Sequence, residues 1–330
     1  MREVQIGSNE AGQRLDKFLK KYLKEAGSGF LYKMLRKKNI TRNGRRAEGS
    51  EILEEGDVVK FFLAEETLEK FRVKEPAGFV GACHGGPEPS ILYEDANILL
   101  ADKPAGMLTQ KAAPEDYSLN EWLLDYLIGS GKVTKEELRA FRPSVCNRLD
   151  RNTSGLVICG KSLAGSRKMS ELLKGHGLKK YYRALAAGEM AEDGIVESWL
   201  VKDQKTNKVW IGESDPDRPD AARIRTGYRV LDASGGASYL EVELFTGKSH
   251  QIRAQMAALG HPLLGDGKYG DTRMNGRLRR EGVHAQLLHA FCLEFPALSG
   301  PFQELSGRRF TAPEPEIFGR VKRVFGLQSS

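Results

Sequence analysis

The residues best suited to chemistry lie in Arg148-Leu149-Asp150 and in the polar turn Asn152-Thr153-Ser154-Gly155 that follows. After this turn, the apolar run from Leu156 to Cys159 is typical of a buried strand. Such a turn would place the carboxylate of Asp150 at the edge of a sheet, where it could face a ligand. The alternative is that Asp150 is an Asx-turn acceptor that only closes the bend.

A second polar cluster lies in Thr246-Gly247-Lys248-Ser249-His250-Gln251-Ile252-Arg253, after a strand that is expected to end at Phe245. The pattern predicts a helix that begins near Ser249 and carries Ile252, Met256 and Leu259 toward the core. His250 is expected at the helix start with its polar atoms satisfied by the backbone.

A third candidate is a tyrosine in Lys179-Lys180-Tyr181-Tyr182-Arg183-Ala184-Leu185, which leads into an expected strand. By itself, a tyrosine in a strand is usually a packing residue with its hydroxyl at the rim. The neighbouring Tyr181 shows how little a single tyrosine indicates without further context.

Together these stretches resemble the RluA-type pseudouridine synthases. Four motifs occur in the order that this family shows: the Lys103-to-Gly106 turn, the Arg148-to-Gly155 stretch, the Lys179-to-Leu185 stretch before Gly188, and the Thr246-to-Arg253 run. The resemblance covers nearly the whole chain apart from an expected linker and the termini. Two positions depart from the pattern of many members, which have histidine where this chain has Asn147 and near Gln110; these departures bear on substrate choice more than on activity.

The resemblance implies roles for several residues. Asp150 would be the catalytic residue, and Arg253 would face its carboxylate. Counting back from Gly188, Tyr182 would be the active-site tyrosine. Leu288 would lie on the strand that closes the pocket under the uracil, and Arg148 would bind RNA by filling the space left by a flipped base or by holding the backbone.

The implied reaction converts uridine to pseudouridine by breaking the N1–C1′ bond, turning the base and rejoining it through C5. It involves no redox change and imports no group, so no cofactor and no metal are expected. The carboxylate could attack C1′ as a nucleophile or remove the proton from C2′ to give a glycal, and the sequence leaves both mechanisms open. The base must first leave its stack. An ordinary phenol with a pKa of about 10 is a poor base at neutral pH, so stacking on the uracil is the favoured role of Tyr182.

The distribution of charge indicates a polyanionic partner. The chain of 330 residues has a net charge of +7, whereas the segment 14–46 has twelve lysines and arginines against two acids and therefore carries +10. The remainder is slightly acidic, at −3. Charge concentrated in this way is typical of a nucleic-acid-binding module.

The same segment predicts an amphipathic helix over 14–24 and a second helix from Phe30 to Lys37, capped by Ser28. Turns at Asn43-Gly44 and 55–57 and a strand over 58–63 follow, and the whole resembles an S4 RNA-binding domain. The residues expected to bind RNA phosphates are Arg14, Lys17, Lys33, Arg36, Lys37 and Arg42. The alternative is that these cations form only a solvated helix face.

We therefore expect an α+β protein with an S4-like domain over 1–63, a glycine- and proline-rich linker over 64–90, and a catalytic domain over 91–330. The catalytic domain is expected to have a mixed, largely antiparallel sheet with flanking helices. Cys83-His84 in the linker is too small a ligand set for a metal, and the four cysteines indicate neither zinc nor disulfides. No apolar run has the length of a membrane span and no signal peptide is evident, so a cytoplasmic protein, by default a monomer, is expected.

The expected function is the isomerisation of specific uridines in RNA. The S4-like domain favours large-subunit ribosomal RNA as the substrate, an argument by analogy. One alternative is a non-catalytic RNA-binding or ribosome-associated protein. A carboxylate-based nuclease would usually have clustered acids for Mg²⁺, and a zinc deaminase would need H-x-E with P-C-x-x-C; the sequence has neither pattern.

Overall fold

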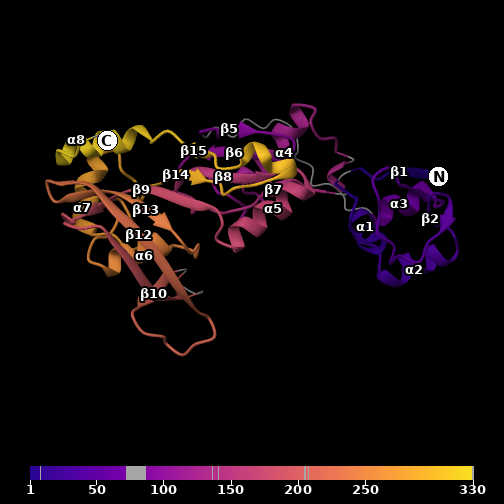
Figure 1. Ribbon diagram of the computed structural model, residues 1–330, viewed down its shortest axis with the longest axis horizontal. Helices are drawn as coiled ribbons and strands as arrows, with labels where there is room; N and C mark the ends of the chain where they lie inside the picture. Colours follow the sequence, from indigo (N-terminus) through magenta and orange to yellow (C-terminus); the bar gives the residue numbers. More distant parts are fainter. Residues whose placement is uncertain are drawn as a thin grey trace.

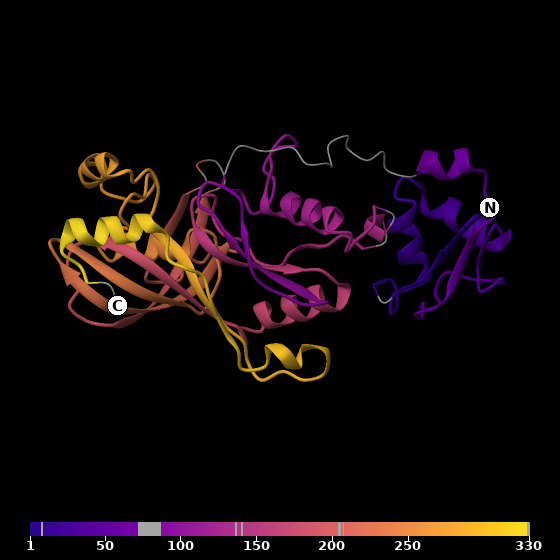
Figure 2. The same cartoon turned by 90° about the horizontal axis from the view of Figure 1, so that it is seen from above.

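A computed structural model describes residues 1–7, 9–71, 87–135, 137–139, 141–203, 206 and 208–328. It contains a small N-terminal unit and a larger unit built on one long sheet (Figure 1). The two units lie at opposite ends of the long axis when the molecule is seen from above (Figure 2). Cys83-His84 and most of the glycines and prolines of the predicted linker lie outside the described residues.

The N-terminal unit has a four-stranded sheet in the order β1-β4-β2-β3, with β1 at Arg2–Gln5, β2 at Ile40–Arg42, β3 at Arg45–Arg46 and β4 at Val58–Phe61. Helices α1 (Leu15–Tyr22) and α2 (Ser28–Arg36) bury their apolar faces in one cluster that includes Phe18, Leu35 and Phe61. Asn43 and Gly44 both have positive φ and form the predicted tight turn between β2 and β3.

Two local predictions in this unit are wrong. The residue that caps α2 is Gly27, and Ser28 is the first helical residue, with no side-chain hydrogen bond at the cap. Residues 65–71, predicted as the start of a linker, form helix α3 (Glu65–Phe71). Leu68 of α3 is fully buried in the N-terminal cluster, and the rings of Phe71 and Phe30 lie 4.6 Å apart. One apolar contact surface is therefore enough to fold this polar segment onto the unit.

The larger unit has an eleven-stranded sheet in the order β11-β10-β12-β13-β9-β14-β8-β6-β5, with β15 on β14 and β7 on β8. Only the pairing of β8 with β14 is parallel among the strand pairs of the described residues, so the predicted mixed, largely antiparallel sheet is confirmed. The strands are β5 (Ser90–Glu94), β6 (Ile98–Lys103), β7 (Ser144–Val145), β8 (Ser154–Gly160), β9 (Lys179–Ala187), β10 (Gly194–Asp203), β11 (Lys208–Gly212), β12 (Ala221–Ser234), β13 (Ala237–Leu244), β14 (Leu288–Glu294) and β15 (Arg309–Thr311).

The helices of this unit are α4 (Leu119–Gly129), α5 (Leu163–Lys174), α6 (Gln251–Ala258), α7 (Thr272–Leu278) and α8 (Glu316–Phe325), with short 3₁₀ segments at Glu137–Arg139, Arg279–Glu281 and Gly300–Leu305. Ser162 caps α5 by accepting a hydrogen bond from the amide of Gly165. Helix α6 starts two residues later than predicted, after His250 in the left-handed conformation. Leu259, predicted to face the core, follows α6 and is 40% exposed.

The parallel contact of β8 with β14 determines where the turn before β8 lies. His289 is opposite Ser154, and Ala290 is opposite Gly155. Gly155 has φ +108°, and a Cβ atom there would lie 2.3 Å from the carbonyl oxygen of Ala290. Only glycine allows the strands to approach this closely, which explains the glycine at position 155. No helix in the described part of the chain is long and apolar enough to cross a membrane.

Candidate active site

The side chain of Asp150 is free to act because the backbone closes its turn. The amide of Thr153 donates to the carbonyl oxygen of Asp150 at 3.0 Å. The carboxylate instead points into a cavity, and its side chain is 25% exposed. The Asx-turn alternative therefore does not describe the structure.

Two further charged side chains, Arg253 and Asp266, hold the carboxylate of Asp150 in place. Nη1 of Arg253, on α6, donates to Oδ2 of Asp150 at 2.7 Å. The other side of the guanidinium forms a two-point contact with Asp266: Nε lies 2.7 Å from Oδ2 and Nη2 lies 2.9 Å from Oδ1. Arg253 is thus fixed by the fully buried carboxylate of Asp266 and presents its remaining nitrogen to the partly exposed carboxylate of Asp150.

The contacts of Arg253 and Asp266 determine the protonation states of these two side chains. Burial alone would lower the pKa of Arg253, but the hydrogen bonds and charges of Asp266 and Asp150 raise it above its usual range. Burial likewise would raise the pKa of Asp266, yet Arg253 and the amides of Lys268 and Tyr269 keep it below its usual value. Arg253 and Asp266 therefore form a permanently charged pair under Asp150.

Several hydrogen bonds fix the loop that carries Asp150. Thr109 Oγ1 donates to the carbonyl of Leu149 at 2.8 Å and accepts from its amide at 3.1 Å. The ammonium of Lys103, fully buried, donates to the carbonyls of Pro104, Met107 and Arg151. Burial lowers the pKa of Lys103 to about 7 against the opposing effect of Asp150 and Asp102. The Lys103-to-Gly106 turn thus has a structural role, because Lys103 holds it against the Arg148-to-Gly155 stretch.

A buried histidine supports the other end of this turn. Nδ1 of His289 lies 2.9 Å from the hydroxyl of Ser154, and Nε2 lies 3.4 Å from the carbonyl oxygen of Ala312. Because a carbonyl only accepts, Nε2 carries the proton and Nδ1 accepts from Ser154. Burial lowers the pKa of His289 to about 4, so the ring is neutral at physiological pH.

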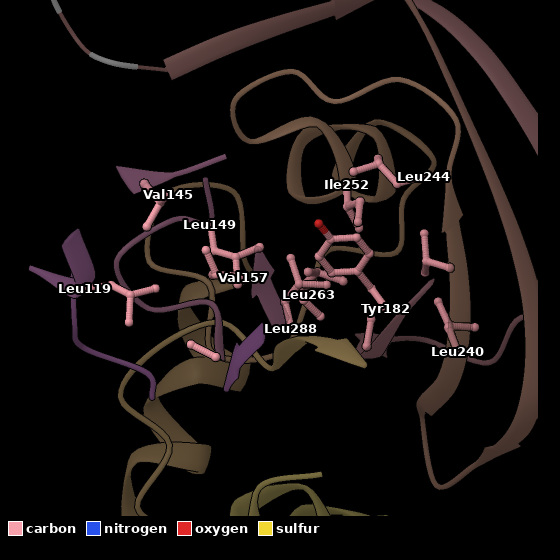
Figure 3. Packing of buried hydrophobic residues seen from close by; sticks show 14 of the residues in the cluster. Leu119, Val145, Leu149, Val157, Tyr182, Leu240, Leu244, Ile252, Leu263 and Leu288 are labelled. Carbon is pink, nitrogen blue, oxygen red and sulfur yellow. The ribbon is translucent and has the colours of Figure 1, made fainter. Parts of the chain in front are cut away.

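The cavity beside Asp150 has a volume of about 850 Å³ and an apolar floor. Leu149, Tyr182, Leu244, Ile252 and Leu288 line it. The ring of Tyr182 lies between Ile252 and Leu288 (Figure 3). Burial and the charge of Asp150 raise the pKa of Tyr182 well above that of an ordinary phenol. A flat apolar surface with a neutral hydroxyl therefore lies next to a carboxylate, an arrangement that suits a planar heterocyclic base.

The polar atoms of His250 are not satisfied by the backbone, contrary to the expectation from the sequence. Its side chain makes no capping bond; instead Nδ1 lies 2.9 Å from the hydroxyl of Tyr269, which accepts a hydrogen bond from the amide of Val209. Nε2 of His250 lies 4.0 Å from Oδ2 of Asp150. Burial lowers the pKa of His250 despite the nearby Asp150. The residue is satisfied by a tyrosine rather than by the backbone, and it lines the cavity.

The remaining predicted residues lie in different settings. Arg148 is exposed at the cavity mouth, and Asn147 next to it accepts a hydrogen bond from the amide of Ile158. In the N-terminal unit, Arg14 is paired with Asp16 at 2.9 Å and Arg42 with Asp57 at 2.7 Å. The exposed cations of that unit include Lys17, Lys33, Arg36 and Lys37.

Sequence reasoning assigned no role to Asp266, Tyr269 and His289. Asp266 ends the run His261-to-Asp266 that continues the fourth motif. An arginine predicted to point inward has five donors to satisfy, and that need is the signal that could have identified Asp266. Tyr269 and His289 meet their partners only through the tertiary fold, and no local pattern indicates them.

The known proteins that this chain resembles belong to one family. Residues 97–258 match the profile of the RNA pseudouridylate synthases. A ribosomal large subunit pseudouridine synthase C of Vibrio cholerae is 28% identical over 298 residues, 88% of each chain. The protein of that name from Escherichia coli K12 is 29% identical over 306 residues, again 88% of each chain. A solved human structure, RNA pseudouridylate synthase domain containing 4, superposes with a TM-score of 0.58 at 20% identity over 72% of this chain and 94% of its own, a similarity of fold.

Proposed function

The chain belongs to the RNA pseudouridylate synthases, enzymes that convert uridine to pseudouridine in RNA, and from this premise we propose that its substrate is large-subunit ribosomal RNA and that Asp150 carries out the reaction. The N-terminal unit would bind the RNA, and the cavity beside Asp150 would take the flipped uridine. Work on ribosomal RNA would take place in the cytoplasm, with a single chain sufficient to form the site.

The observation that carries the assignment of Asp150 is the asymmetry of its carboxylate. Oδ2 accepts from Arg253, whereas Oδ1 has no hydrogen-bond partner within the described residues. A carboxylate held by one oxygen keeps its charge and orientation while the other oxygen remains free to react. The apolar cavity wall beside it excludes water from the reacting atoms.

In the proposed reaction the ribose of the flipped uridine lies at Oδ1 of Asp150. That oxygen either bonds to C1′ as the N1–C1′ bond breaks or removes the proton from C2′. The freed uracil turns and C5 bonds to C1′. On the first route the bond between Oδ1 and C1′ breaks in this step, and on the second route Asp150 returns the proton to C2′. The C5 proton then leaves to solvent and N1 gains a proton. Arg253 stabilises the anionic form of Asp150 whenever the carboxylate is regenerated.

Tyr182 is proposed to stack on the uracil while the base is detached and turning. The raised pKa of its hydroxyl argues against a phenolate base. Leu288, on the strand that pairs with β9, also lines the cavity close to Tyr182 and would limit how the ring tilts (Figure 3). Arg148, exposed at the mouth, is proposed to occupy the space in the RNA that the target base leaves.

The choice of ribosomal RNA rests on the curated relatives, whose names specify the large ribosomal subunit. The test is tritium release from RNA labelled at uridine C5, with transcripts of large-subunit RNA, small-subunit RNA and transfer RNA offered in parallel. We expect release from the large-subunit transcript at a small number of positions. Release from transfer RNA alone would overturn the substrate assignment, and binding without release from any RNA, naked or assembled, would favour a non-catalytic RNA-binding protein.

A further inference from the structure

The cavity beside Asp150 is strongly cationic. Six lysines and arginines line it against a single carboxylate, that of Asp150; the cations are Arg148, Lys174, Lys180, Arg223, Lys248 and Arg253. Arg253 is neutralised by Asp150 and Asp266, and Arg223 pairs with Glu197. The other four have no carboxylate partner among the described residues, which leaves a surplus of positive charge at the mouth.

Lys180 differs from the other three in where its strand places it. On β9, residues two apart point to the same face, so Lys180 shares the face of Tyr182. Tyr182 and Lys180 both line the cavity. Lys180 therefore lies two residues along the strand from the ring that is proposed to stack on the uracil, on the same face of β9.

The ammonium of Lys180 packs against the turn that precedes α6. A methyl group placed on Gly247 would lie 3.5 Å from Nζ of Lys180. The residue is partly buried, and burial lowers its pKa. A cation held in a partly desolvated position without a counterion is unfavourable, so the site is suited to an anion supplied by the substrate.

A flipped nucleotide brings such an anion with it. With its base on Tyr182 and its ribose at Asp150, the phosphates on its 5′ and 3′ sides must pass through the cavity mouth. We propose that Lys180, packed against the Thr246-Gly247-Lys248 turn, binds a backbone phosphate that flanks the target uridine. This inference rests on the proposed function and adds a specific phosphate site to it, which makes Lys180 a positioning residue rather than a catalytic one.

The neighbouring Lys179 provides a matched control. It carries the same charge one residue earlier, points to the opposite face, is 54% exposed and is paired with Glu294 at 2.9 Å. Lys180→Met and Lys179→Met therefore remove the same charge from almost the same place in the sequence but from different faces of β9. Lys180→Arg keeps the charge and should retain binding.

The experiment measures affinity for a large-subunit RNA fragment, with kcat and KM for tritium release, over a series of salt concentrations. We expect Lys180→Met to weaken affinity about three- to tenfold near 0.1 M salt and to lower the slope of log K against log salt by about 0.7 to 0.9, the loss of one phosphate contact. Lys179→Met should leave both unchanged. The effect should fall on KM more than on kcat, and the thermal midpoint of Lys180→Met should not fall.

Single methylphosphonate substitutions on the 5′ and 3′ sides of the target uridine identify the phosphate. One of them should weaken binding by the parent protein and have no further effect on Lys180→Met, because both changes remove the same contact. Additive losses at both positions, or equal behaviour of Lys180→Met and Lys179→Met, would overturn the phosphate site. The proposed function fails separately, if the parent protein releases no tritium from unmodified RNA.

Discussion

The active-site cavity and the N-terminal unit both collect positive charge, but the arginine beside Asp150 is held differently from the lysines of the N-terminal helices. In the cavity, Arg253 is buried and bonded to two carboxylates. In the N-terminal unit, Lys17 and Lys33 are exposed on helices and Lys37 is exposed directly after α2, as affinity for a polyanion requires. The difference indicates that Arg253 provides geometry and that the exposed lysines provide attraction. Variants in the two regions should therefore fail in different ways.

The largest effect is expected at Arg253. Arg253→Met leaves Asp266 buried without a counterion and frees the carboxylate of Asp150, so we predict a fall in kcat of about 10²- to 10³-fold. Unfolding free energy should fall by about 3 to 5 kcal/mol, the cost of breaking a buried ion pair. Single-turnover tritium release and urea denaturation measure the two losses. Activity of Arg253→Met within a few-fold of the parent would mean that the pair with Asp150 has no part in the reaction.

The loss of stability that His289 causes as the pH falls should be confined to the larger unit. The pKa of His289 is about 4 in the fold against 6.5 unfolded, so the unfolded chain binds more protons between these values. Stability from this residue is present above pH 6.5 and falls as the pH is lowered to 4, by about 3 kcal/mol in total. The segment 1–63 has no histidine and should not share this dependence.

Urea midpoints between pH 7 and 4.5 test this prediction. His289→Gln should flatten the dependence, whereas His284→Gln, at an exposed position, should leave it unchanged. If the parent and His289→Gln lose stability in parallel, another group is responsible.

A smaller effect is expected at Tyr182. Tyr182→Phe keeps the flat ring and should retain kcat/KM within a few-fold, whereas Tyr182→Leu should lose about ten- to hundredfold, since stacking on a base contributes about 1 to 3 kcal/mol. Tritium release under kcat/KM conditions distinguishes them. An equal loss in both variants would show that the hydroxyl rather than the ring is the important group, and would favour proton transfer by Tyr182.

The smallest effect is expected from substitutions of the exposed lysines in the N-terminal unit. Replacing Lys33 and Lys37 by glutamine should weaken RNA binding a few-fold and reduce the salt slope by about 1.4 to 1.8, with kcat unchanged. Arg42→Gln is the contrasting variant: its partner Asp57 is buried, so stability should fall more than affinity. A change in kcat caused by Lys33 and Lys37 would contradict the division of labour between the two regions.

The same contrast explains what the sequence could predict. The N-terminal helices can be predicted from their local sequence because their apolar and basic faces alternate within a few residues. Helix α3 was missed because its seven residues contain a single fully buried side chain, Leu68. Its polar composition is indistinguishable from that of a linker until the N-terminal core is present to receive it.

The active site was predictable only as separate motifs. Asp150 and Arg253 are 103 residues apart and meet through the sheet and α6, and their pairing was expected from the family resemblance. His250 was misjudged because its partner Tyr269 lies in a loop after α6. Asp266, Tyr269 and His289 form contacts that depend on tertiary structure, where no spacing rule applies.

The measurement that tests the account most directly is tritium release from C5-labelled large-subunit RNA by the parent protein and by Asp150→Ala and Asp150→Asn. Asn keeps the shape of the side chain without its charge. We predict release by the parent and a loss of at least about 10³-fold in both variants, with RNA affinity retained because the N-terminal cations are intact. Release by the variants at a rate close to that of the parent would contradict the assignment of Asp150 as the reacting group.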